Sequence, residues 1–403
     1  MRVSKNLNIH RRLWWQAHLY IGLTLGAMFA VIGLTGSLIV FWQPLDALLN
    51  ADLFKTSVVC AETRYRPIDN IINSALTHAP AKGKLRSLSF PNPERPVFTA
   101  TYEVANPGAD WDDRFLVYVE PCNGLVTGSR FYDSQLKPLG GPLMGIIIRM
   151  HTSLLLNFPG FWLGNHVLSF GSALLMVSVV IGAYLWWPRN GKWLAALTFK
   201  RNASGARLNY DLHKVFGIAS GSLLLMSLFT GIHMYNPWTD WIDQGVNYLS
   251  PVTRLASAPI ISQTIPGQRI ISAEQAVHVA QNSVPNGQPI AISFPEDDQG
   301  VYSINLKTVA IWDSEINIDQ YNGKVIQLFT PTTATVGDHF LGWLFPLHTG
   351  QALGLPGRIL ILLLGLVPAV LYVTGFIRWC QKRKSSCLHK SKQSRALNKT
   401  RRE

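Results

Sequence analysis

Four long apolar stretches alternate with more polar segments along the chain. They cover about residues 17–42, 161–187, 212–236 and 355–379. A helix needs about 20 apolar residues to cross roughly 30 Å of hydrocarbon, and each stretch is long enough. The pattern therefore predicts four membrane-spanning helices.

Two polar stretches of about a hundred residues, roughly 45–148 and 238–340, follow the first and third spans. In each stretch a short amphipathic helix pattern, "PIDNIINSALTHA" or "SAEQAVHVAQNS", precedes extended segments with an Asn-Gly turn signal between them. Each stretch is therefore predicted to fold as a small α+β domain. Because both follow an odd-numbered span, we expect them on the same side of the membrane.

The two halves of the chain repeat one another. His18 and His213 lie 195 residues apart, and each is followed by Gly after four residues and by Thr-Gly after seventeen. His151 and His348 lie 197 residues apart, and each is followed by Thr and, eight residues on, by Pro-Gly. The outer segments "LRSLSFPNPERPVFTATYEV" and "PIAISFPEDDQGVYSINL" also resemble each other. We therefore expect two parallel repeats of span, domain and span around a pseudo-two-fold axis.

The basic residues predict the orientation. Of 36 Lys and Arg, 19 lie in three short segments: before the first span, between the second and third spans, and from Arg378 onward. Lys and Arg are retained near the cytoplasmic ends of spans, so both termini are expected in the cytoplasm and both large domains outside. The N-terminal span is interpreted as an uncleaved anchor because its apolar region is too long for a signal peptide.

The expected boundaries follow in chain order. They are an N-terminal cytoplasmic segment with span 1 at 1–44, outer domain 1 at 45–148, span 2 at 149–188, a cytoplasmic basic loop at 189–211, span 3 at 212–237, outer domain 2 at 238–340, span 4 at 341–380 and a cytoplasmic basic tail at 381–403.

Composition narrows the function classes. The chain has 403 residues, of which 48% are hydrophobic and 15% charged, as expected for a membrane protein with some soluble mass. Its net charge of +13 is concentrated in the basic tail, which is expected to be disordered and to touch anionic lipid, so a role with nucleic acid is not expected. Cys60 and Cys122, both on the expected outer side, are able to form a disulfide in an oxidising compartment.

The four repeated histidines are the candidate ligands. His18 and His213 are expected near the cytoplasmic ends of spans 1 and 3, and His151 and His348 at the outer entrances of spans 2 and 4. An ionisable residue at membrane depth is a functional candidate, and neutral imidazole binds haem iron in an apolar setting. A group on the symmetry axis would receive one ligand from each half. A site near each membrane face is therefore predicted.

Other residues bear on the prediction that the four histidines bind haem. Gly22 and Gly217 follow their histidines by one helical turn, where a missing side chain would admit a porphyrin edge. No Cys, Asp or Glu lies near enough in sequence to complete a usual zinc or copper set. His166 and His233 have no counterpart in the other half of the chain. Each is an alternative candidate, either as a ligand on the outer side or as a residue near a substrate.

The motifs "AHLYIG" and "LHKVFG", the two "HT" plus "PG" arrangements, the late "TG" pairs and "GAYLWWPR" at 182–189 resemble the PepSY-associated transmembrane family. Characterised members include inner-membrane ferric-siderophore reductases of Gram-negative bacteria. The resemblance implies a four-helix membrane core, two periplasmic PepSY domains and two b-type haems. His18 and His213 match the family's odd-span histidines, and His151 and His348 match those before its even spans.

The expected activity is transmembrane electron transfer to a ferric siderophore in the periplasm, with release of Fe(II). The expected partners are the siderophore, membrane lipid and either a cytoplasmic reductase or quinol as electron donor. The chain lacks a GxGxxG nucleotide fingerprint, so a nicotinamide or flavin would arrive on a partner. Two alternatives stay open: a transporter of the iron chelate, and a membrane-anchored PepSY regulatory protein without redox activity.

Overall fold

The computed structural model describes residues 2–57, 61–188, 191–200, 202–256, 259–264, 267 and 269–400, with side chains of these residues from 9 to 385 except 195 and 256. Cys60 lies outside the described residues, so its pairing with Cys122 stays a prediction. The chain forms two compact units. One comprises Met1–Leu38, His166–Ile232 and Ile359–Glu403, and the other Ile39–Asn165 and His233–Arg358.

The first unit is helical and carries the membrane-spanning stretches. Its long helices are α1 (Arg2–Ile39), α6 (Leu163–Trp186), α8 (Gly205–Ile232) and α13 (Gly354–Thr400), with the short α7 (Trp193–Leu197) between α6 and α8. Four stretches are long and apolar enough to cross a membrane: Ile9–Ile39, Leu163–Trp186, Gly205–Ile232 and Gln351–Ser385. The prediction of four helices long and apolar enough to span a membrane is confirmed.

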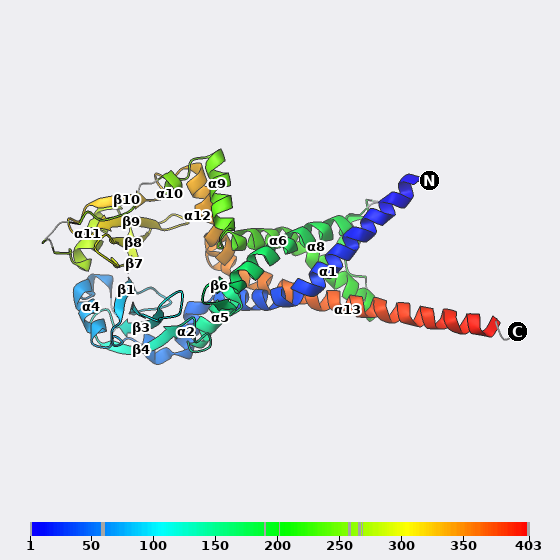
Figure 1. Cartoon of the computed structure of the whole chain (residues 1–403), viewed down its shortest axis with the longest axis horizontal. Helices are drawn as coiled ribbons and strands as arrows, with labels where there is room; N and C mark the ends of the chain where they lie inside the picture. Colours follow the sequence, from blue (N-terminus) through cyan, green and yellow to red (C-terminus); the bar gives the residue numbers. More distant parts are fainter. Residues whose placement is uncertain are drawn as a thin grey trace. The chain divides into compact units, whose positions relative to one another are not determined.

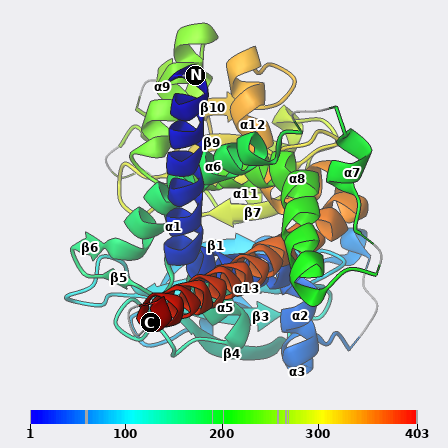
Figure 2. The ribbon, with the colours of Figure 1, turned by 90° about the vertical axis from the view of Figure 1, so that its right-hand side faces the viewer.

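Helices α1 and α13 cross at small residues. Gly33 and Gly365 meet at the crossing, where a β-carbon at Gly33 would lie 2.3 Å from the Gly365 carbonyl oxygen. Ser37 Oγ donates a 2.7 Å hydrogen bond to the Leu362 carbonyl of the facing helix. Small residues let two backbones approach closely in a membrane. From this crossing the two helices diverge towards the chain termini, as Figures 1 and 2 show.

The basic tail differs from the sequence-based expectation. The expected disordered segment instead continues α13 as helix to Thr400. From Phe376 to Thr400 the chain contains no Gly or Pro, and eight of these 25 residues are Lys or Arg, which are good helix formers. A helix already nucleated in the preceding span can propagate into such a sequence.

The second unit is built on one eight-stranded antiparallel sheet in the order β10-β9-β8-β7-β1-β2-β3-β4 (Figure 1). The strands are β1 (Lys84–Ser89), β2 (Phe98–Val104), β3 (Asp113–Val119), β4 (Val126–Asp133), β7 (Gln288–Ser293), β8 (Val301–Lys307), β9 (Ser314–Asp319) and β10 (Val325–Phe329).

Strands β1 and β7 join the two halves of this sheet. Leu88 pairs with Ile292, and each of these residues begins a sequence of the form apolar-Ser-Phe-Pro. Each strand therefore meets its own counterpart. The expected outer domains thus share one continuous hydrogen-bonded sheet, although the sequence predicted them as two domains.

Two helices cover one face of the sheet. The helices α4 (Ile68–Leu76) and α11 (Ala273–Ser283) pack Ile71 and Ala276 into the main core of this unit. Side chains alternate along the strands, so Phe98, Ala100 and Tyr102 of β2 face this core. The short helices η1 (Glu62–Arg64), α9 (Trp238–Leu249) and α10 (Thr253–Ala256) also belong to this unit.

The other face of the β1–β4 half packs on α2 (Trp42–Leu49) and α3 (Ala51–Phe54). Phe54 forms a small apolar cluster there with Val97 and Tyr118. Thr99 and Thr101, which alternate with the core residues of β2, point to this second face.

The Pro-Gly motifs have different structural roles in the two halves. Pro159-Gly160 forms the two-residue turn between β5 (Asn157–Phe158) and β6 (Phe161–Trp162), and Gly160 has a φ of 72°. Pro356 lies in the first turn of α13, where its missing N–H is tolerated. In both halves a separate helix precedes the span: α5 (Leu143–Ser153) before α6, and α12 (Val336–Thr349) with η2 (Gln351–Leu353) before α13.

Candidate functional site

The four repeated histidines form two pairs. His18 on α1 and His213 on α8 are the first pair, with ring centroids 6.3 Å apart and ring planes at 75°. His151 on α5 and His348 on α12 are the second pair, with centroids 6.2 Å apart and planes at 56°. The first pair lies in the helical unit and the second in the sheet unit.

Each histidine of the first pair is oriented by a neighbouring span. His18 Nδ1 lies 2.9 Å from the Ser178 carbonyl oxygen on α6, and 3.0 Å from Ser178 Oγ. His213 Nδ1 lies 3.1 Å from the Leu371 carbonyl oxygen on α13, and 2.9 Å from Thr374 Oγ1. A carbonyl oxygen only accepts, so Nδ1 is the protonated nitrogen in both rings and Nε2 keeps its lone pair.

A glycine one turn further along each neighbouring helix makes room for the ring. A β-carbon at Gly182, four residues after Ser178, would lie 3.1 Å from His18 Cε1. A β-carbon at Gly375, four residues after Leu371, would lie 3.3 Å from His213 Cε1. Both distances are shorter than ordinary van der Waals contact, so any larger residue would push the imidazole. The surroundings of the two imidazole rings are therefore alike.

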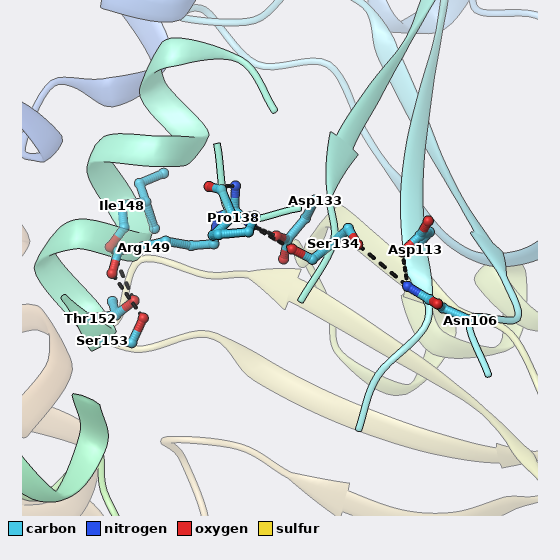
Figure 3. A network of polar contacts seen from close by, with 9 residues as sticks. All are labelled: Asn106, Asp113, Asp133, Ser134, Pro138, Ile148, Arg149, Thr152 and Ser153. Atoms are coloured by element: carbon cyan, nitrogen blue, oxygen red, sulfur yellow. Dashed lines mark hydrogen bonds and ion pairs between the residues drawn. The ribbon is translucent and has the colours of Figure 1, made fainter. Parts of the chain in front are cut away.

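The second pair depends on the anchoring of α5 (Figure 3). Arg149, two residues before His151, forms an ion pair with Asp133 and donates to the Ser134 carbonyl at 2.9 Å and to the Pro138 carbonyl at 2.5 Å. The pair is largely buried, with 14% and 12% of the two side chains exposed. These contacts fix the helix that carries His151 to the end of β4.

The C-terminal turn of α5 has a further contact. The Tyr235 hydroxyl donates a 2.6 Å hydrogen bond to the carbonyl of Thr152. The residue beside His151 is thus held from a second side.

The helix that carries His348 is anchored at its N-terminus. Thr335 and Asp338 form a reciprocal capping box, and Asp338 also accepts from Thr253 N at 2.8 Å and Thr253 Oγ1 at 2.6 Å. Burial acts to raise the pKa of Asp338, but the hydrogen bonds from Thr253 and Thr335 outweigh it and leave the pKa below its ordinary value. The carboxylate form therefore stabilises α12.

Close backbone approaches set where each histidine helix meets the following span. A β-carbon at Gly164, early in α6, would lie 1.8 Å from the Ser153 carbonyl oxygen at the end of α5. A β-carbon at Gly357, early in α13, would lie 2.1 Å from the Gly350 carbonyl oxygen just after α12. Only glycine fits at either place.

The histidines without repeat partners lie elsewhere. His233 Nε2 is 2.9 Å from Asp243 Oδ1, and Arg254 holds the other carboxylate oxygen of Asp243 at 3.2 Å. His166 lies on α6 in the helical unit, with its ring 6.5 Å from that of Phe170. Neither histidine is part of the two pairs.

The pair geometry suits one metal ion between two imidazoles. A metal–imidazole bond is about 2 Å long, and a ring nitrogen lies about 1.1 Å from its ring centre. Two imidazoles on opposite sides of one ion thus have centroids about 6 Å apart, close to the observed 6.3 and 6.2 Å. Within the described residues, no group of three or more His, Cys, Asp or Glu is placed to hold an ion, which disfavours a tetrahedral zinc site. Two axial ligands are the number that haem needs.

Sequence reasoning identified the histidines but missed the residues that orient them. Ser178, Thr374, Gly182 and Gly375 were not predicted. A signal was present, because "SVVIGAYLW" at 178–186 and "LYVTGFIRW" at 371–379 share the Gly at the fifth position and the Trp at the ninth. Gly22, expected to face a porphyrin edge, has open space where its β-carbon would be.

These features define a membrane protein with four apolar helices and an antiparallel α+β region. The chain belongs to the family described as the PepSY-associated TM region, whose model matches residues 15–382. A comparison with curated proteins found no match.

Proposed function

We propose that this protein is a haem-dependent membrane oxidoreductase of the ferric-siderophore reductase type. In this proposal it lies in the bacterial inner membrane, with both termini cytoplasmic and the sheet unit in the periplasm. Electrons from a cytoplasmic reductase or quinol cross the membrane and reduce a periplasmic ferric siderophore. One electron converts each bound Fe(III) to Fe(II), which oxyanion chelators hold far less tightly.

The observation that carries the proposal is the pair geometry. Two histidine pairs have ring centroids 6.3 and 6.2 Å apart, and each pair takes one residue from each half of the chain. The first pair would hold one b-type haem and the second pair another. Bound haem would supply a one-electron carrier with bis-histidine ligation.

The chain's own residues would supply orientation and tuning. The carbonyls of Ser178 and Leu371 hold the Nδ1–H of the first pair and direct Nε2 to the ligand position. Arg149 and Asp338 fix the two helices that carry the second pair. The pairing of Leu88 with its counterpart Ile292 supports the proposed pseudo-two-fold arrangement of the two repeats.

The test compares the haem content of the parent protein with that of single-histidine variants. We expect about two b-type haems per purified chain by pyridine haemochrome, with a sharp low-spin α-band after dithionite reduction. His18→Ala or His213→Ala should remove one haem, and His151→Ala or His348→Ala the other. His278→Ala, which changes an exposed histidine on α11, is the control and should keep both haems.

The result also separates the competing functions. A chain that binds no haem when haem is plentiful during expression would contradict the proposal, and would favour the chelate transporter or the PepSY regulatory protein. Haem-loaded protein should be reoxidised by a ferric siderophore after reduction, with Fe(II) trapped by ferrozine. Full haem content in all four histidine variants would reject the ligand assignment.

A further inference from the structure

A cavity of about 160 Å³ lies on the α2 face of the β1–β4 half of the sheet. It is here called the Arg95 cavity. Its lining includes Trp42, Arg95, Thr99, Tyr118, Arg130 and Tyr132. These residues come from α2, the loop before β2 and strands β2 to β4, so the site is formed within one unit. It shares no residue with the histidine pairs.

The cavity has one uncompensated positive charge. Arg130 donates to both oxygens of the buried Asp46 carboxylate, at 3.1 and 2.5 Å, so these two charges cancel. The Arg95 guanidinium has no hydrogen bond or ion pair with any residue that the structure describes, and its Nε is fully buried. Burial lowers the pKa of Arg95, an effect that Tyr118, Tyr132 and Asp46 partly offset. A monoanion would complete the charge balance.

A second donor in the same cavity lacks a partner. Thr99 is 3% exposed, and its Oγ1 is buried without a hydrogen bond among the described residues. A buried donor left unpaired destabilises a protein, and native structures rarely retain one without a bound group to satisfy it. Four such donors belong to residues that line this one small space: Arg95 Nε, Thr99 Oγ1, Arg130 Nε and the Tyr118 hydroxyl.

The other half of the sheet does not repeat this arrangement. Thr99 of β2 pairs with Tyr118 of β3, and the matching pair in the second half is Ser303 of β8 with Asn317 of β9. Ser303 Oγ donates to Glu315 at 3.2 Å, and Asn317 donates to Gln327 at 3.3 Å. These two residues of the second half have hydrogen-bond partners, whereas Thr99 Oγ1 and the Tyr118 hydroxyl, at the matching positions of the first half, are buried without one among the described residues.

We propose that the Arg95 cavity binds the carboxylate of a small ring-bearing monoanion. A guanidinium fork matches a carboxylate in shape, and the single free charge favours a monoanion over a phosphate of nearly two charges. Aromatic rings of Trp42, Tyr118 and Tyr132 supply the apolar walls. A cavity of about 150 Å³ holds a benzene-sized molecule, so the available volume suits one ring.

The test uses benzoate as the probe and neutral benzamide, which has nearly the same shape, as its control. Calorimetric titration of the full-length protein in detergent should give saturable benzoate binding with a Kd of about 1 mM or lower, and benzamide at least tenfold weaker. Arg95→Gln should abolish saturable binding. Arg114→Gln, which removes a positive charge outside the cavity on the same domain, should bind benzoate like the parent.

Two more variants keep the test decisive if Arg95→Gln does not fold. Arg95→Lys keeps the charge but loses the fork, and should weaken benzoate binding about tenfold. Thr99→Val keeps the shape but removes the hydroxyl, and should weaken binding several-fold without lowering the melting temperature. Haem content should be unchanged in all of them, because this inference does not depend on the proposed redox function. Absence of saturable benzoate binding by the parent, equal binding of benzamide, or undiminished binding by folded Arg95 variants would each overturn the proposal.

Discussion

Gly182 and Gly375 give the first pair its space, and each should be intolerant of even a methyl group. Gly182→Ala would place a β-carbon 3.1 Å from His18 Cε1, so the ring must shift. We expect a shifted or broadened α-band and loss of part of the haem, measured by reduced-minus-oxidised spectra. Gly245→Ala, whose β-carbon would meet nothing within 4 Å, is the matched control and should leave the spectrum unchanged.

Asp338 should make stability fall in acid. Its folded-state pKa is lower than its unfolded-state value, so its contribution is present above about pH 4 and lost as the pH falls through the folded-state pKa. Asp338→Asn should cost about 1 to 3 kcal/mol at pH 7 and flatten the acid decline. Melting temperatures from pH 7 to 3 would check this, with the exposed Asp52→Asn as control. An equal acid decline in Asp338→Asn and parent would contradict the assignment.

At this scale the sequence predicts which histidines matter but not what holds them. His18 and His213 stand out because they recur with the same following residues. Their partners Ser178 and Leu371 lie 160 and 158 residues away along the chain. Which carbonyl meets which ring depends on the rotation of each helix about its axis, and a single sequence does not specify it.

At the scale of the element, Arg149 is the anchor of α5. Arg149→Gln would leave the largely buried Asp133 without its ion-pair partner, and losses of this kind cost about 3 to 5 kcal/mol. We expect the haem of the second pair to be lost preferentially while the first pair keeps its haem. Haem content per chain would check this, with exposed Lys137→Gln as the control for charge. Equal loss of both haems would indicate general unfolding instead.

The crossing of α1 and α13 should resist any side chain larger than hydrogen. Gly365→Ala would place a β-carbon 2.3 Å from Ser37 Oγ and 2.5 Å from the Gly33 carbonyl oxygen. Forcing the helices apart should cost about 1 to 3 kcal/mol, measured as a lower melting temperature in detergent. Gly221→Ala, with its β-carbon 3.9 Å from Val179, should melt near the parent temperature.

Elements were predicted best where one pattern runs uninterrupted. The four spans and the Asn-Gly turns followed directly from hydrophobic length and turn chemistry. The separate helices α5 and α12 were not predicted, because their apolar residues run into those of the next span. Their boundaries depend on Leu154, at a φ of 54°, and Gly350, at a φ of 79°. A leucine in that conformation gives no sequence signal.

For the whole molecule, the proposed orientation can be tested with single cysteines. Two chains are used, each with a single cysteine and every other native cysteine replaced by Ser: Lys84→Cys reports on β1, and the native Cys380 reports on the end of span 4. Both positions are exposed. In spheroplasts, a membrane-impermeant maleimide should label Lys84→Cys directly and Cys380 only after the membrane is opened. The reverse labelling would invert the proposed topology.

The repeat was readable from matching motifs, but the joining of its two halves was not. Antiparallel pairing of β1 with β7 depends on two edges meeting in space, and the sequence contains no marker for that meeting beyond the shared Ser-Phe-Pro.

Because Leu88 faces its own counterpart, a chain cut to one half would present β1 or β7 as an open edge. Such a half would be expected to recruit a second copy of itself through that edge and restore an eight-stranded sheet. The same pairing describes how a single ancestral gene product, working as a homodimer, would have become one polypeptide by duplication and fusion.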